Sequence, residues 1–190
     1  MQPPADFNYA INRLFAHMDQ AYDQTARATR FACCGCEQNC CQTRFHHHTL
    51  LEYEYLQSGV GQLSAQQQAL VRRRAREAVE QTRKLERRNE PAGVMCPLNM
   101  DGICGLYAWR PMICRLHGVP HLVRLPDGSI KKGRGCDDFY AQCKKGPLHE
   151  LDRTPLYLEM ADLERRLRRH RGVKRKTKMT IAEMLVNEIH

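Results

Sequence analysis

Two cysteine-rich stretches decide the fold of this chain: residues 33–41 read CCGCEQNCC, and residues 96–118 read CPLNMDGICGLYAWRPMICRLHG. The two-residue gap between Cys33 and Cys36 lets two thiolates reach one ion around a tight turn, as in zinc knuckles and iron–sulfur loops. The ten cysteines fall into these two stretches and one later pair: Cys33, Cys34, Cys36, Cys40, Cys41, Cys96, Cys104, Cys114, Cys136 and Cys143. Such clustering predicts a metal site.

Disulfides are the alternative use of ten cysteines. The N-terminus, MQPPADFNYA, lacks the basic start and the apolar core of a signal peptide. We therefore expect a cytoplasmic protein, in which thiols stay reduced and clustered cysteines act as metal ligands or redox groups. A secreted chain could instead form five bridges, but adjacent cysteines do not readily pair with each other.

The composition is that of a folded domain. Of the 190 residues, 42% are hydrophobic and 27% are charged, which excludes a disordered or collagen-like chain. No apolar run reaches the roughly 18–20 residues that span a membrane. The formal net charge is +9, and basic residues are concentrated in residues 64–90 and 153–190. We expect one domain, or one domain with helical arms.

Amphipathic helices are expected before and after the first cysteine stretch. Apolar side chains repeat at three- and four-residue steps over residues 6–28, with Asp6 as the expected N-cap. Ser64 and Gln67 form a capping box, which predicts that a basic helix begins there and continues to about Arg88.

Two further helices are expected near the C-terminus. Thr154 is the expected N-cap of the first, Pro155 suits the first helical position, and Gly172 ends that helix. Thr180 and Glu183 form a second capping box, which predicts a short last helix.

Strand signals occur at two places in the chain. Residues 119–125 and 129–132 flank the turn sequence Pro126-Asp127-Gly128, which predicts a β-hairpin. Residues 45–61 fit either a strand or a short helix, and the pattern does not separate the two.

These patterns predict a mostly α fold with a short β-hairpin. The expected architecture is a small, loop-rich domain that a cysteine-bound metal centre organises and amphipathic helices flank. We expect an N-terminal helix over residues 1–30, a cysteine-cluster domain over residues 31–150 with the basic helix 64–90 inserted, and basic C-terminal helices over residues 151–190.

The second cysteine stretch carries a resemblance to a known family. It reads Cys-Pro-Leu-Asn at residues 96–99 and CGLYAWRPMICR at residues 104–115. Over residues 31–143 the chain resembles the YkgJ-type cysteine-cluster family, a zinc- or iron-chelating domain marked by CxxCxxCC and by C-P-x-L…C-x-x-Y-x-x-R-P-x-x-C-R. The chain departs from the first motif, because Cys34 is extra and three residues separate Cys36 from Cys40. Cys33 and Cys34 are therefore alternative ligands.

The resemblance implies a set of eight thiolate ligands. Eight thiolates fill two four-coordinate sites or bind two clusters. Cys34 and Cys143 are left over, and Cys143 is the reserve candidate for Cys136. The implied ligands are Cys33, Cys36, Cys40, Cys41, Cys96, Cys104, Cys114 and Cys136.

Groups beside the cysteines are expected to balance the negative charge of the thiolates. Arg110 and Arg115 flank Cys114, and Tyr107 could donate its hydroxyl or pack beside the site. Both zinc and iron–sulfur centres accept four cysteines, so spacing does not choose between them, and adjacent cysteines favour iron–sulfur slightly. An iron–sulfur centre implies electron transfer or redox sensing with a redox partner protein, whereas zinc would be structural.

Three other features of the sequence bear on function. His46-His47-His48 is expected to form a solvated turn, and His117 stands three residues after Cys114, a usable ligand spacing. Residues 164–178 hold nine Lys or Arg and could bind nucleic acid or an acidic partner, although few aromatic residues lie among them. The chain contains no GxGxxG, Walker, GxSxG or HExxH motif, which argues against an enzyme. An enzyme with a metal- or thiol-based activity is the third alternative, and Cys34 and Cys143 are the thiols left for a nucleophile.

Overall fold

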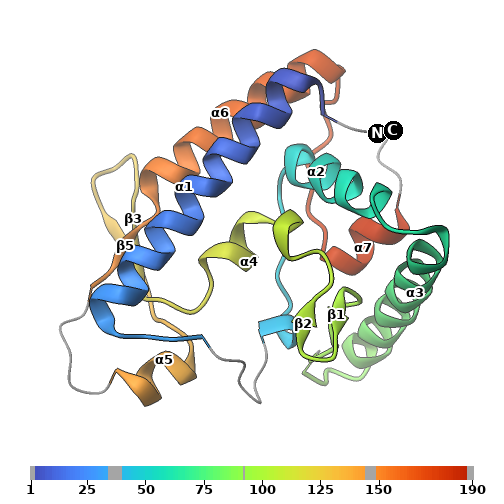
Figure 1. The fold of residues 1–190 in the computed structure, drawn as a ribbon, viewed down its shortest axis with the longest axis horizontal. Coiled ribbons are helices and arrows are strands. Elements are labelled where there is room, and N and C mark those ends of the chain that lie inside the picture. Colours follow the sequence, from blue (N-terminus) through green and yellow to red (C-terminus); the bar gives the residue numbers. More distant parts are fainter. Residues whose placement is uncertain (1–2, 34–39, 92, 144–148, 188–190) are drawn as a thin grey trace.

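A computed structural model describes residues 3–33, 40–91, 93–143 and 149–187, so Cys34 and Cys36 lie outside the described residues. The fold is mostly helical, as predicted (Figure 1). The helices are α1 (Ala5–Thr29), α2 (Leu50–Gly61), α3 (Ala65–Arg87), α4 (Met112–Leu116), α5 (Asp137–Gln142), α6 (Thr154–Arg171) and α7 (Ile181–Val186). Short 3-10 turns are η1 (Cys40–Gln42) and η2 (Tyr107–Trp109).

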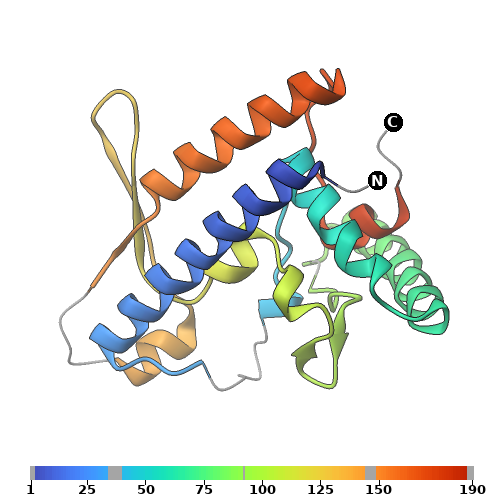
Figure 2. The ribbon, with the colours of Figure 1, turned by 45° about the horizontal axis from the view of Figure 1, so that its top comes forward.

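Helices α1 and α6 lie side by side and run in opposite directions (Figures 1 and 2). Each helix buries one apolar face in the core, as the helical periodicity predicted: Ile11, Leu14, Phe15 and Met18 from α1, and Leu156, Met160, Leu163 and Leu167 from α6. The expected N-cap of α1 is wrong. Pro4 occupies that position without a side-chain hydrogen bond, and Asp6 lies in the first turn.

Residues 45–61, which the sequence left open, contain the buried helix α2. The Thr49 side chain accepts a hydrogen bond from the Glu52 amide and caps the helix. Tyr53 and Tyr55 are both buried. A helix that is covered on nearly all sides carries no clear amphipathic period, which explains why its sequence resembled a strand equally well.

Both predicted capping boxes are present. Ser64 and Gln67 cap α3, and Thr180 and Glu183 cap α7. The two helices pack against each other at one end of the molecule (Figure 1). At α6 the prediction was one residue off: Arg153 is the N-cap, and the hydroxyl of Thr154 accepts a hydrogen bond from the Arg124 amide.

The predicted hairpin is also present. β3 (His121–Arg124) pairs antiparallel with β4 (Ile130–Gly133), and Gly128 in the turn has a φ of 82°. A parallel pairing of β3 with β5 (Leu151–Asp152) was not predicted. A second, smaller pair joins β1 (Asn99–Met100) to β2 (Ile103–Cys104) within the second cysteine stretch.

One hydrophobic core runs through the described part of the chain. It includes Phe15 from residues 1–30, Leu51 and Leu116 from residues 31–150, and Leu163 and Leu185 from residues 151–190. Among the described residues no helix has the length and the apolar character needed to cross a membrane.

Candidate metal centre

The loop-rich centre of the molecule encloses a cavity of about 700 Å³. Seven of the eight cysteines expected to bind metal line it, and Cys36 lies outside the described residues. Cys143 lies elsewhere, because its thiol donates to the Thr29 carbonyl oxygen at 3.3 Å. The cysteines around the cavity are Cys33, Cys40, Cys41, Cys96, Cys104, Cys114 and Cys136.

Backbone hydrogen bonds hold these cysteines around the cavity. The Cys96 amide donates to the Cys41 carbonyl oxygen at 2.8 Å and joins the two cysteine stretches. The Cys136 amide donates to the Gly118 carbonyl oxygen at 2.9 Å, and the Cys136 sulfur accepts from the Phe139 amide at the start of α5. Cys104 and Cys114 are carried by β2 and α4. Secondary structure or a backbone hydrogen bond therefore positions the backbone of these five cysteines.

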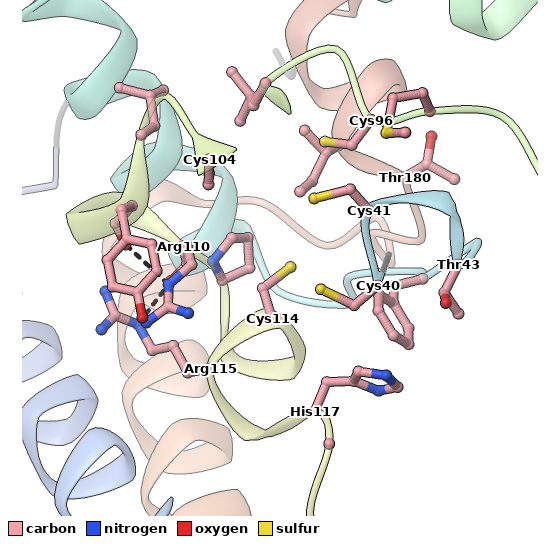
Figure 3. A pocket seen from close by; sticks show the side chains of 18 of the residues that line it. Cys40, Cys41, Thr43, Cys96, Cys104, Arg110, Cys114, Arg115, His117 and Thr180 are labelled. Carbon is pink, nitrogen blue, oxygen red and sulfur yellow. Dashed lines mark hydrogen bonds between the residues drawn. The ribbon is translucent and has the colours of Figure 1, made fainter. Parts of the chain in front are cut away.

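Most of the labelled sulfurs face one another across the cavity. In Figure 3 the sulfurs of Cys40, Cys41 and Cys96 point from one wall toward the wall that carries Cys104 and Cys114, and the Cys114 sulfur points back. Even so, no group of three His, Cys, Asp or Glu side chains among the described residues is arranged to hold a single metal ion. The structure gathers the expected ligands around one cavity and does not show a metal centre.

The cysteines influence one another's ionisation. Burial raises the pKa of Cys114 and Cys104 and raises that of Cys96 to about 12, and neighbouring cysteines raise each of them further. Cys41 behaves in the opposite way. A hydrogen bond from the Cys40 thiol, with help from the charge on Arg110, lowers the pKa of Cys41 to about 6, while the same bond raises the pKa of Cys40. The hydrogen bond between Cys40 and Cys41 therefore favours the thiolate form on Cys41.

The three residues expected beside the thiolates take different positions. Arg110 stacks over the Tyr107 ring, with 3.5 Å between the guanidinium carbon and the ring centroid, and its charge favours the Cys41 thiolate. Tyr107 itself is 60% exposed. Arg115 faces away from the sulfurs: it donates to the Arg110 and Ala108 carbonyl oxygens.

Arg115 joins the second cysteine stretch to helix α1. Its guanidinium pairs with Asp19 of α1 at 2.5 Å and lies over the Phe15 ring of the same helix. The Asp19 carboxylate is also 3.7 Å from Arg110. Arg115 thus positions the loop that carries Cys104 and Cys114 (Figure 3), and Arg110 brings positive charge to the cavity.

Tyr22 belongs to the cavity although nothing in the sequence marked it. Burial, and then the nearby Cys33 and Cys136, raise the pKa of its hydroxyl. A Cβ atom on Gly118 would stand 3.1 Å from the Tyr22 oxygen and 3.9 Å from the Cys136 sulfur, so these groups meet closely. The helical periodicity of α1 only assigned Tyr22 to its apolar face.

The histidine run was expected to be a solvated turn, and for His47 that prediction is wrong. His47 is 2% exposed and lines the cavity. Its backbone forms an isolated bridge with Met179, which draws the side chain inward. His117 lines the same cavity and packs edge-on against Phe45, and burial lowers the pKa of its imidazole.

Part of the basic segment is used inside the fold. Arg171 pairs with the buried Glu54 at 3.0 Å, and Arg168 pairs with Glu164 and donates to Thr177. Guanidinium groups that bind buried carboxylates are not available to phosphates, so the surface left for nucleic acid is smaller than the sequence suggested.

Comparisons of the chain with protein-family models, with curated proteins and with solved structures give no match. The resemblance to the YkgJ-type family therefore stays a prediction from the motifs. The shared cavity is a separate observation, because the fold alone brings the cysteines together there.

Proposed function

We propose that this chain is a metal-binding protein whose cysteines hold an iron–sulfur or zinc centre in the central cavity. One observation carries the proposal: cysteines from three separate parts of the chain, the two cysteine stretches and Cys136, line the same cavity. Thiolates are the preferred ligands of both zinc and iron–sulfur clusters. Cys40, Cys96, Cys104, Cys114 and Cys136 are thiols and not disulfides. A reducing compartment such as the cytoplasm would keep them so.

The mutual influence of the thiols supports a division of the ligands into two groups. Each of Cys96, Cys104 and Cys114 has its pKa raised by Cys41, and Cys114 also by the other two. These four cysteines would form one set. Cys33 and Cys136 both raise the pKa of Tyr22, which supports a second set beside that tyrosine. Cys41, Cys114 and Cys33 all raise the pKa of Cys40, so Cys40 could belong to either set.

Zinc and an iron–sulfur cluster place different demands on the arrangement of the sulfurs. A zinc ion holds four sulfurs at about 2.3 Å, which requires them to converge on one point. The described thiols share a cavity of about 700 Å³ without such a convergence. When bound, an iron–sulfur cluster supplies one-electron chemistry. Zinc remains the alternative, and its role would be structural.

The chain's own residues would tune such a centre. Arg110 brings a positive charge that favours thiolate at Cys41. Leu98 and Leu106 also line the cavity, and apolar surroundings strengthen charge interactions. We propose electron transfer or redox sensing, with a redox partner protein, as the function that this combination serves.

Cysteine variants test the proposal. Cys96→Ser and Cys114→Ser should each lose most of the bound metal, whereas Cys143→Ser should keep the wild-type content because Cys143 bonds to the Thr29 carbonyl away from the cavity. Iron, zinc and sulfide would be measured in each protein after purification without oxygen. Wild-type metal content in both cavity variants would overturn the proposal. Metal binding is coupled to folding at such sites, so circular dichroism should accompany each measurement.

A further inference from the structure

His47 is held firmly at the wall of the cysteine cavity. It follows Cys41 by six residues and is 2% exposed. Its amide donates to the Met179 carbonyl oxygen at 2.7 Å, and the Met179 amide donates back at 3.0 Å. His47 lines the same cavity as the seven cysteines. Its position is therefore fixed by two backbone hydrogen bonds to a distant part of the chain.

Neither ring nitrogen of His47 has a hydrogen-bond partner among the residues that the structure describes. Nδ1 lies 3.7 Å from the Glu52 Oε1 atom, which is close enough for attraction but too long for a hydrogen bond. The opposite ring nitrogen, Nε2, is also buried and has no hydrogen-bond partner in the described part of the chain. A buried nitrogen without a partner is unusual, because most buried polar groups are hydrogen-bonded.

Glu52 connects His47 to the segment that carries Cys114. Its carboxylate accepts from the Thr49 hydroxyl at 2.6 Å and from the Met112 amide, at the start of α4, at 3.0 Å. Cys114 follows Met112 by two residues in the same short helix. The carboxylate is thus fixed, and it lies between the histidine and a cysteine of the cavity.

We propose that His47 is a nitrogen ligand of the metal centre and that Glu52 orients it. Histidines that bind metals usually donate their second ring N–H to a carboxylate, which fixes the tautomer and the ring direction. Here the Glu52 carboxylate would accept a hydrogen bond from Nδ1–H, which would leave Nε2 to bind the metal. The inference rests on the proposed function, and it changes the ligand set from cysteine alone to cysteine with one histidine. Zinc and the iron of iron–sulfur clusters both accept that combination.

A spectroscopic experiment on the whole chain tests this proposal. Protein labelled with ¹⁵N-histidine would be loaded with iron and sulfide, reduced and examined by pulsed electron paramagnetic resonance. If the metal is zinc, X-ray absorption at the zinc edge would distinguish nitrogen from sulfur ligands by their bond lengths. The matched variants are His47→Ala and His48→Ala, because His48 is adjacent and exposed.

The wild-type protein and His48→Ala should show a nitrogen ligand, and His47→Ala should not. A wild-type protein that holds metal without any nitrogen ligand would overturn the role of His47 and leave the cysteine centre intact. A nitrogen signal that persists in His47→Ala would overturn it as well. Wild-type protein that binds no metal would remove both proposals. The wild-type measurement decides the question even if His47→Ala does not fold.

Discussion

The Cys96 amide donates a 2.8 Å hydrogen bond to the carbonyl oxygen of Cys41, and this bond joins the two cysteine stretches of the chain. It places the end of the first stretch beside the start of the second. The Gly105 amide, which follows Cys104, donates to the Leu98 carbonyl oxygen at 2.8 Å and closes the next loop. Ordinary backbone hydrogen bonds therefore build the walls of the cavity that the thiols line.

Gly59 should not tolerate a larger side chain. A Cβ atom there would stand 2.4 Å from Cγ of Trp109, whose ring packs against Tyr55 in the core. We expect Gly59→Ala to lower the free energy of unfolding by about 1–3 kcal/mol, because overpacking forces the ring to move. Urea unfolding would measure the change.

Gly61 provides the matched control for that experiment. It lies in the same helix, and a Cβ atom there would meet nothing within 4 Å. Gly61→Ala should leave stability unchanged or raise it by up to about 1 kcal/mol, since alanine favours helix. Equal stabilities for the two variants would show that the contact with Trp109 is not tight.

Arg171 should contribute more to the stability of the fold than the exposed arginines of the basic segment. Its Nε and a terminal nitrogen each bind one oxygen of Glu54 at 3.0 Å, and Glu54 is fully buried. Arg171→Ala would leave that carboxylate unpaired, which costs about 3–5 kcal/mol in a fully buried pair. We expect Arg171→Ala to lower the free energy of unfolding by about 2–3 kcal/mol, because the Arg171 side chain is 24% exposed and the pair is partly screened by solvent.

Arg166→Ala is the control for Arg171→Ala. The Arg166 side chain is 56% exposed, and its contact with Asp162 is 3.9 Å long. Removing such a surface pair should cost less than about 1 kcal/mol. Similar urea midpoints for the two variants would contradict the importance of the Glu54–Arg171 pair.

Glu52 should make stability depend on pH. Burial opposes its ionisation, but the His47 imidazole, the Thr49 hydroxyl and the Met112 amide outweigh burial and lower the pKa of the carboxyl. A group whose pKa is lower in the folded state stabilises the fold above its ordinary pKa. That contribution disappears as the pH falls through the folded value.

Glu52→Gln tests this pH dependence. At pH 7 the variant should be less stable than the wild type by about 1–3 kcal/mol, because hydrogen bonds to a charged acceptor are lost. The difference should shrink as the pH falls below the ordinary range of a glutamate. Glu77→Gln, at an exposed position on α3, should show no difference at any pH. A gap between wild type and Glu52→Gln that stays constant with pH would contradict the assignment.

Local signals predicted most of the secondary structure. Three of these signals are the capping boxes at Ser64 and Thr180 and the turn at Gly128. Each depends only on residues that are neighbours in the sequence, so each can be recognised without the rest of the fold. Their helices and hairpin are present as expected. The parallel strand at Leu151 depends on β3, thirty residues earlier, and no local pattern indicates such a pairing.

The candidate site also contains residues that the sequence indicated and residues that it did not. The cysteines were visible in the sequence, and their common cavity agrees with the expectation that they act together. His47 was misjudged because its burial depends on Met179, which lies far along the chain. Tyr22 and Glu52 reach the site from helices whose patterns only report which residues are apolar.

Metal and sulfide analysis of protein purified without oxygen tests the central claim most directly. We predict a coloured protein that contains iron and acid-labile sulfide, bound by the cysteines of the cavity. A colourless protein with bound zinc would keep the cysteine centre and assign it a structural role. Folded protein that contains neither iron nor zinc, and whose cavity thiols all react with a thiol reagent, would contradict the claim.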